Sequence, residues 1–236
     1  MIRIYYKDLS GDCSKEQSLA MYGYLPKERQ DRIQKLKNKD IAKKHIQIGY
    51  FLQQVISKEL SIPMDCICYL YGDNGKPSLD YNLIKKHLAD KEDVFEKEVP
   101  DIYFNMSHSG RYVVVAVSEE NVGIDIEYKT GSYERISKRF FCKAEYEGMK
   151  SLATEQEKRD FFLETWTRKE AYLKLTGKGL LMPLDGFHVY DTIKYEDADI
   201  HFHMVDMKCY GLDDSYKICV CSKEIEYVVY GEDTYC

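Results

Sequence analysis

The stretch Trp166-Thr-Arg-Lys-Glu-Ala-Tyr-Leu-Lys-Leu-Thr-Gly-Lys-Gly-Leu180 predicts a helix that ends at Gly177. Within it, Glu170 and Lys174 are four residues apart, which places a carboxylate and an ammonium on one helix face. A surface ion pair, which stabilises a protein little, would explain the same spacing. The motifs upstream therefore decide between an ordinary helix surface and a functional site.

Three short upstream motifs carry the polar groups of such a site. Gly123-Ile-Asp-Ile-Glu127 alternates apolar and acidic residues, so on a strand Asp125 and Glu127 point to the same face. On its own this alternation would also fit the solvent face of an edge strand. Phe104-Asn-Met-Ser-His-Ser-Gly110 is expected to form a polar loop, and Gly75-Lys-Pro77 a basic turn. Three carboxylates, two lysines and a Ser-His pair together suit a metal ion with a polyphosphate.

The composition is that of an ordinary globular protein, with 44% hydrophobic and 31% charged residues among 236. The net charge of −6 argues against a general nucleic-acid binder. We find no signal-peptide run and no stretch that approaches a membrane span, which predicts a cytoplasmic protein. The eight cysteines form no C-x-x-C motif, which favours reduced thiols over zinc or disulfides. We expect Cys66 with Cys68, and Cys219 with Cys221, to share the faces of strands.

The chain resembles itself at about half its length, which predicts a duplicated unit. Three pairs of segments recur in the same order: Phe51–Glu59 with Phe162–Glu170, Gly75-Lys76 with Gly177-Lys178, and Tyr112–Glu120 with Tyr216–Glu224. We therefore divide the chain into an N-terminal pseudo-repeat, residues 1–120, and a C-terminal pseudo-repeat, residues 121–236.

Each unit is expected to combine a long amphipathic helix with sheet strands. Apolar periodicity predicts helices over Asp40–Leu60 and Lys158–Leu175, and strands over Tyr112–Val117 and Tyr216–Cys221. The closing quarter, Phe187 to Tyr230, reads as an antiparallel meander. The predicted fold class is α+β, with pseudo-two-fold duplicated α/β units and the active site in the cleft between the halves.

The motifs GKP, FNMSHSG, GIDIE and WTRKEAYLKLTGKGL, in this order, resemble the signature set of Sfp-type 4′-phosphopantetheinyl transferases. The resemblance extends from about Pro26 to Leu184. It implies a pseudo-dimer of two α/β units with one site between them. It also implies Mg²⁺-dependent transfer of phosphopantetheine from coenzyme A to a serine of an apo acyl or peptidyl carrier protein, with release of 3′,5′-ADP. Such a protein would act as a monomer, without nucleic acid or membrane.

The resemblance also assigns roles in the acidic part of the site. Asp125, Glu127 and Glu170 match the magnesium ligands of the family, and Asp125 also lies at the coenzyme A site. Lys174 would contact the α-phosphate and help to neutralise the leaving group. Either Glu170, or Glu127 through a water molecule, would take the proton of the carrier serine.

The remaining roles concern coenzyme A. Ser107 and His108 match contacts to coenzyme A, with the histidine reaching a pyrophosphate oxygen, and Lys76 matches a phosphate-binding lysine. Taken alone, Ser107 and His108 would fit a turn in which Ser107 caps nearby amides, and Lys76 would fit an ordinary exposed lysine of a hairpin. A Ser-His hydrolase is disfavoured because no G-x-S-x-G elbow is present.

A basic segment, Lys27 to His45, precedes these motifs in an otherwise acidic chain. The family uses this region for the 3′-phosphate and adenine of coenzyme A, and Lys43, Lys44 and His45 are the matching positions. A solvated helix face is the alternative. Two other functions would fit the same groups: a different Mg²⁺-dependent phosphotransfer, for which no P-loop or kinase signature is found, and an inactive module that binds coenzyme A or a carrier protein.

Overall fold

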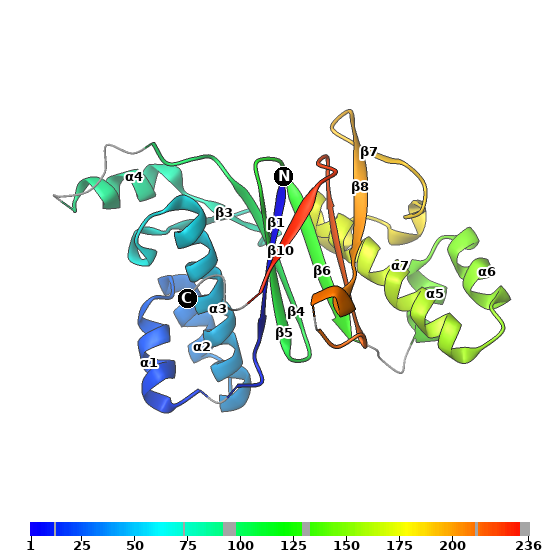
Figure 1. The fold of residues 1–236 in the computed structure, drawn as a ribbon, viewed down its shortest axis with the longest axis horizontal. Coiled ribbons are helices and arrows are strands. Elements are labelled where there is room, and N and C mark those ends of the chain that lie inside the picture. The colour runs from blue at the N-terminus through cyan, green and yellow to red at the C-terminus, as the bar shows by residue number, and fades with distance from the viewer. Residues whose placement is uncertain (12, 73, 92–97, 129–132, 211, 232–236) are drawn as a thin grey trace.

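The computed structural model describes residues 1–11, 13–72, 74–91, 98–128, 133–210 and 212–231. Two sheets lie face to face, with α1–α3 outside one sheet and α5–α7 outside the other (Figure 1). The helices are α1 Lys15–Gly23, α2 Lys27–Gln34, α3 Lys39–Leu60, α4 Tyr81–Ala89, α5 Tyr133–Phe140, α6 Lys143–Ser151 and α7 Glu155–Thr176. The strands are β1 Ile2–Asp8, β2 Tyr69–Tyr71, β3 Pro77–Leu79, β4 Tyr103–Ser109, β5 Tyr112–Ser118, β6 Val122–Tyr128, β7 Ile193–Tyr195, β8 Ala198–Val205, β9 Tyr216–Ser222 and β10 Tyr227–Tyr230.

The two large sheets repeat one topology. The first has the strand order β10-β1-β5-β4 and the second β6-β9-β8-β7, while β2 and β3 form a separate hairpin. In each sheet a central strand, β5 or β9, pairs antiparallel with both of its neighbours. The order β1-β5-β4 therefore corresponds to β6-β9-β8. This is the duplication that the repeated sequence segments predicted.

Alternation along the strands divides the apolar residues among separate cores. On β5, Val114 and Ala116 pack between the two sheets against residues of β6 and β9 such as Ile124 and Val220. The opposite face of β5 packs beneath α3, for example at Val115. A further core beneath α7 contains Ala171, Tyr172, Leu175, Cys219 and Cys221. Each half thus buries one helix against the outer face of its own sheet.

The two long helices have well-defined ends. At the start of α7, Thr154 and Glu157 form a capping box, and Gly177 ends the helix in the left-handed conformation with a φ of 67°. At α3 the side chain of Asn38 caps the first turn, and Ser61 adopts a φ of 54° after the last. Both helices match their predicted positions to within a few residues.

Several expectations were wrong. The motif Phe104–Gly110 is not a loop: Phe104 to Ser109 belong to strand β4, because each of them pairs with β5, and only Gly110 lies in the turn that follows. The last strand, β10, does not extend the meander. Both edges of β9 are already occupied, so β10 pairs in parallel with the free edge of β1. Gly75 lies in the turn between β2 and β3, so Ser61 rather than Gly75 is the counterpart of Gly177.

Smaller differences concern single residues. Cys66 lies in a 3₁₀ turn and Cys68 precedes β2, so this pair does not share a strand face, whereas Cys219 and Cys221 do face the same core. The seven cysteines within the described ranges are free thiols.

Candidate active site

The acidic wall of the candidate site is one face of β6. Ile124 and Ile126 point into the core between the sheets, so Asp125 and Glu127 point to the opposite face, toward α7. Asp125 is only 3% exposed, whereas Glu127 is half-buried at the end of the wall. The strand reading of the GIDIE motif is therefore confirmed, and its acidic residues do not form a solvent face.

Helix α7 lies against this face because residue 123 is glycine. A Cβ atom at Gly123 would lie 2.0 Å from the carbonyl oxygen of Ala171 and 2.6 Å from the nitrogen of Leu175. Any side chain there would push the helix away. The close approach brings the Nζ atom of Lys174 to 2.5 Å from Oδ1 of Asp125, as an ion pair across the two elements.

Strand β4 supplies the third wall, and its polar side chains bridge to β6. The Ser107 hydroxyl donates to Asp125 Oδ1 at 2.8 Å and accepts from Lys174 Nζ at 2.7 Å. Asn105 accepts a hydrogen bond from the backbone N–H of Ile124 at 3.1 Å. Since β4 belongs to the first sheet and β6 to the second, the site lies at the junction of the two halves, as the sequence predicted.

The three carboxyl groups crowd negative charge in a partly desolvated place. Burial raises the pKa of Asp125, and burial with the nearby Asp125 charge raises that of Glu170 and takes that of Glu127 to about 7. Within the described residues, Oδ2 of Asp125 is a buried side-chain oxygen without a hydrogen-bond partner. A hard cation such as Mg²⁺ would satisfy that oxygen and offset the crowded negative charge. The donor set therefore fits the ion that the motif resemblance implied.

A basic wall lies on the other side, on the first turns of α3 and the end of β4. Lys44 donates to the carbonyl oxygen of Gly110, in the turn after β4. The rings of His45 and His108 lie 5.7 Å apart, edge to face. A cavity of about 390 Å³ is lined by Lys43 and Lys44 together with this turn. The structure thus places Lys43 and Lys44 at one cavity and His45 beside His108.

The surroundings of both histidines favour the neutral imidazole. Desolvation lowers the pKa of His108 to about 4, with a further lowering from the basic side chains nearby. Desolvation likewise lowers the pKa of His45, and Arg29 and Lys44 add to the effect. A neutral imidazole can still donate one hydrogen bond to a phosphate oxygen.

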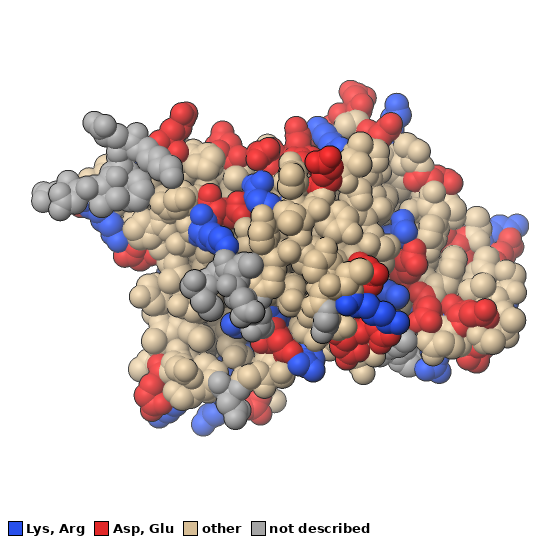
Figure 2. Space-filling view, viewed as in Figure 1, with Lys and Arg blue, Asp and Glu red and all other residues tan. Residues whose placement is uncertain are grey.

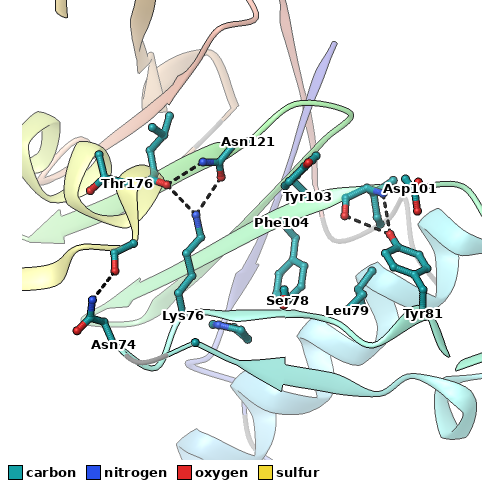
Figure 3. A pocket seen from close by; sticks show the side chains of 15 residues that line it. Asn74, Lys76, Ser78, Leu79, Tyr81, Asp101, Tyr103, Phe104, Asn121 and Thr176 are labelled. Carbon is teal, nitrogen blue, oxygen red and sulfur yellow. Dashed lines mark hydrogen bonds between the residues drawn. The ribbon is translucent and has the colours of Figure 1, made fainter. Parts of the chain in front are cut away.

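Lys76 reaches the site from the β2–β3 hairpin, and Figure 3 shows its side chain extended toward the end of α7. A cavity of about 360 Å³ is lined by Lys76, Glu170 and Lys174. The Nζ atom of Lys76 donates to the carbonyl oxygen of Leu175 at 2.9 Å and to Oδ1 of Asn121 at 3.0 Å. Desolvation lowers the pKa of Lys76 to about 8.

Four residues near the site were not singled out from the sequence: Arg29, Asn105, Asn121 and Trp166. The Trp166 indole N–H donates to Glu127 Oε1 at 3.2 Å, and Arg29 contacts Met106 beneath the basic wall. Trp166 and Asn105 stand inside the quoted motifs, and Arg29 inside the basic segment, so their positions offered a signal. Asn121 offered none, because its role depends on a contact between distant segments.

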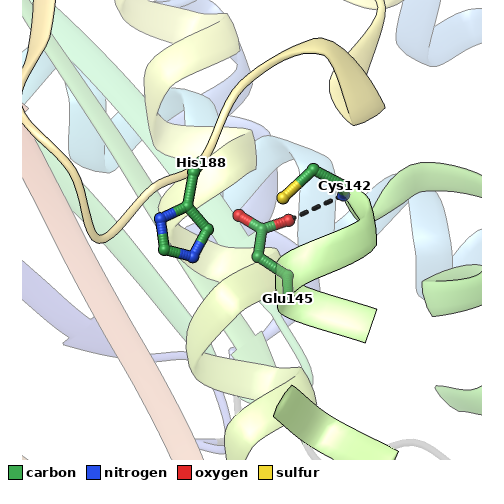
Figure 4. A group of neighbouring side chains, drawn as sticks. All are labelled: Cys142, Glu145 and His188. Carbon is green, nitrogen blue, oxygen red and sulfur yellow. Dashed lines mark hydrogen bonds between the residues drawn. The ribbon is translucent and has the colours of Figure 1, made fainter. Parts of the chain in front are cut away.

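A second cluster of metal-ligating groups, Cys142, Glu145 and His188, lies on the far side of α7 (Figure 4). Glu145 is fully buried, and both of its oxygens already accept hydrogen bonds, Oε1 from the backbone of Val189 and Oε2 from that of Cys142. Its Oε2 also lies 2.9 Å from the ammonium of Lys169. We interpret this cluster as a structural ion pair, because the ammonium already neutralises the carboxylate.

Comparison with known proteins places the chain in a family. An N-terminal 4′-phosphopantetheinyl transferase model matches residues 12–120, and the model of the 4′-phosphopantetheinyl transferase superfamily matches residues 121–221. The chain is 28% identical to 4′-phosphopantetheinyl transferase Sfp of Bacillus subtilis, over 96% of this chain and 94% of that protein. It is 31% identical to 4′-phosphopantetheinyl transferase psf-1 of Bacillus pumilus, over 73% and 68%.

The chain therefore belongs to the 4′-phosphopantetheinyl transferase superfamily, and it is an enzyme of that class, as the order of its motifs predicted. In the part of the chain that the structure describes, no helix is long and apolar enough to cross a membrane.

Proposed function

We propose that this transferase moves the 4′-phosphopantetheine group of coenzyme A onto a serine of an apo acyl or peptidyl carrier protein and releases 3′,5′-ADP. The observation that carries the proposal is the buried Asp125 carboxylate, whose Oδ1 contacts Lys174 while Oδ2 has no partner in the described chain. The acidic wall and the basic wall lie on the two sides of β4, where Ser107 contacts Asp125 and the next residue, His108, lies beside His45. A diphosphate with its metal ion is complementary to both walls.

Asp125, Glu127 and Glu170 would hold Mg²⁺, which, when bound, supplies positive charge to the diphosphate oxygens. The other contacts to coenzyme A come from both halves. Lys174, Ser107 and His108 bind near the diphosphate, and Lys76 approaches it from the hairpin. Lys43, Lys44 and His45 hold the 3′-phosphate and adenine end.

The reaction joins the serine Oγ to the β-phosphorus of coenzyme A and breaks the bond from that phosphorus to the bridging oxygen of the diphosphate. The serine proton passes to a carboxylate, for which Glu170 and, through water, Glu127 are the candidates. The negative charge of the departing 3′,5′-ADP develops beside Lys174, whose ammonium stabilises it. The protein is proposed to work as a cytoplasmic monomer, with coenzyme A and the carrier protein as its partners.

Intact-protein mass spectrometry tests this proposal. Purified protein is incubated with coenzyme A, Mg²⁺ and either an apo acyl or an apo peptidyl carrier protein. We expect the carrier to gain one phosphopantetheine group, and a chelator or Asp125→Ala to prevent the gain. Coenzyme A binding without any mass gain on either carrier would instead identify an inactive binding module.

A further inference from the structure

Three of the elements that carry proposed site residues, β6, α7 and the β2–β3 hairpin, meet at the side chain of Asn121. Residue 121 directly precedes β6, the strand of Asp125 and Glu127. Its Nδ2 donates to the carbonyl oxygen of Leu175 at 2.9 Å, at the end of α7 and next to Lys174. Its Oδ1 accepts from Lys76 Nζ at 3.0 Å, at the hairpin. Figure 3 shows the side chains of Asn121 and Lys76 both pointing to one carbonyl oxygen beside Thr176, and the Lys76 ammonium also contacting Asn121.

The carbonyl oxygen of Leu175 needs these donors. The last carbonyl groups of a helix lack a partner within the helix, and Leu175 is only 1% exposed. Lys76 and Asn121 both donate to it at 2.9 Å, and a cation is also favoured at this end by the helix dipole. Without Asn121, Lys76 would lose one acceptor and the carbonyl one donor.

Asn121 itself is held firmly, so it can orient the other groups. Its backbone carbonyl oxygen accepts a hydrogen bond from the hydroxyl of Ser222, a fully buried residue of β9. Two residues later Gly123 contacts the backbone of α7 so closely that no Cβ would fit. The start of β6 and the last turn of α7 are thus joined at both residues.

We propose that Asn121 is a positioning residue for coenzyme A: it fixes the ammonium of Lys76 and the last turn of α7, with Lys174, at one distance from β6. This inference rests on the proposed function, because it concerns the same site. Asn121 would touch no substrate atom. Its contribution would appear as weaker binding and slower use of coenzyme A, while recognition of the carrier protein is unaffected.

The test compares Asn121→Ala and Asn121→Ser with Asn82→Ala, which alters an exposed asparagine of α4. We expect the Asn121 variants to lower kcat/KM for coenzyme A about tenfold, the size of one lost hydrogen bond to a charged group. We expect the KM for the carrier to change less than twofold, and calorimetry to show weaker binding of coenzyme A. Melting curves identify which variants are folded, and Asn121→Ser, the milder change, serves if alanine destabilises the fold.

A double-mutant comparison with Lys76→Met decides whether the two side chains act together. If Asn121 works through Lys76 and the helix end, the loss in the double variant is smaller than the product of the two single losses. Fully multiplicative losses, or an Asn121→Ala enzyme with unchanged kinetics and coenzyme A affinity, would overturn the inference. A wild-type protein without transfer activity would refute the proposed function instead, and the calorimetric comparison would still test Asn121.

Discussion

The two halves place different side chains at corresponding positions, and the difference explains why only the second carries the acidic site. Aligning β5 with β9 at Tyr112 and Tyr216 makes three residues of β1 equivalent to three of β6: Arg3 to Gly123, Tyr5 to Asp125 and Lys7 to Glu127. The helices align at Glu59 and Glu170, as their sequences predicted.

In the first half, side chains of β1 and α3 fill the place that corresponds to the acidic site, and they satisfy one another. Arg3 Nε donates to Glu59 Oε2 at 2.8 Å, and the hydroxyl of Tyr5 donates to the other carboxylate oxygen. In the second half glycine replaces the arginine, so α7 approaches the strand, and aspartate replaces the tyrosine. Lys174 has no helical counterpart, because α3 ends at Leu60. In the first half Arg3 balances the charge of Glu59, whereas the second half places three carboxylates near a single ammonium, that of Lys174. The excess negative charge makes the second half a site that attracts an external cation.

The strongest test of this comparison removes the carboxylates one at a time. We expect Asp125→Ala, Glu127→Ala and Glu170→Ala each to lower phosphopantetheine transfer about a thousandfold or more, because the metal charge supplies several kcal/mol to the transition state. The matched change in the first half, Glu59→Ala, should lower the melting temperature and keep the transfer rate of the folded protein. Radiolabelled or mass-based transfer assays at saturating Mg²⁺ measure both. Full activity in Asp125→Ala would contradict the metal assignment.

Lys169 and Lys58, which directly precede Glu170 and Glu59, test how the two long helices are packed. Lys169 is fully buried and pairs with Glu145 at 2.9 Å, whereas its counterpart Lys58 is exposed above the rings of Tyr5 and Tyr230. Lys169→Met leaves a buried carboxylate unpaired, and we expect it to lower the free energy of unfolding by about 3–5 kcal/mol. For Lys58→Met we expect a loss of about 1 kcal/mol or less. Denaturant unfolding measures both, and equal losses would show that α3 and α7 depend on these lysines alike.

Most of the fold could be predicted from the sequence because its signals are local. Both long helices, the paired strands and the duplication follow from apolar periodicity and repeated segments. The strand nature of Phe104–Gly110 could not be predicted, because its serines resemble a turn until Ser107 is placed against Asp125. The pairing of β10 depends on which sheet edge is free, a property of the whole fold.

The site was predicted more completely in its residues than in their contacts. Helical spacing alone would pair Lys174 with Glu170, but its ion pair in the structure is with Asp125, because α7 contacts β6 at Gly123. Lys76 was expected to face a phosphate, and its ammonium also bonds to the end of α7. Both differences arise from contacts between segments far apart in the sequence, which no local pattern encodes.

The raised pKa of Glu127 predicts how the stability of the metal-free protein depends on pH. Its pKa is raised from 4.5 to about 7, so between these values the folded state keeps a proton that the unfolded chain releases. This contribution to stability is complete below about pH 4.5 and is lost as pH rises through 7. We expect the free energy of unfolding to lose on the order of 1–3 kcal/mol from this group over that range.

Thermal unfolding in the presence of a chelator, at several pH values between 5 and 8, measures this effect. Glu127→Gln should flatten the fall in melting temperature as pH rises. Adding Mg²⁺ at pH 8 should raise the melting temperature of the wild type more than that of the variant, because the metal would stabilise the charged carboxylate. The idea fails if both proteins show the same pH dependence and the same response to Mg²⁺.

The first half should contribute binding rather than chemistry, and Lys44 gives the smallest of the expected effects. It lies on α3, across the junction from the carboxylates, and its ammonium donates to Gly110 beside a cavity of about 390 Å³. A lysine holding the 3′-phosphate acts as a point charge, so Lys44→Ala should raise the KM for coenzyme A about fivefold to tenfold and leave kcat unchanged.

Toward 3′-dephospho-coenzyme A the variant and the wild type should differ little, since the group that Lys44 binds is missing. Lys85→Ala, which alters an exposed lysine of α4 outside the basic segment, controls for loss of general positive charge. Equal losses toward both substrates would move the 3′-phosphate contact to Lys43 or His45, whereas a fall in kcat would mean that the first half also sets the geometry of the reacting groups.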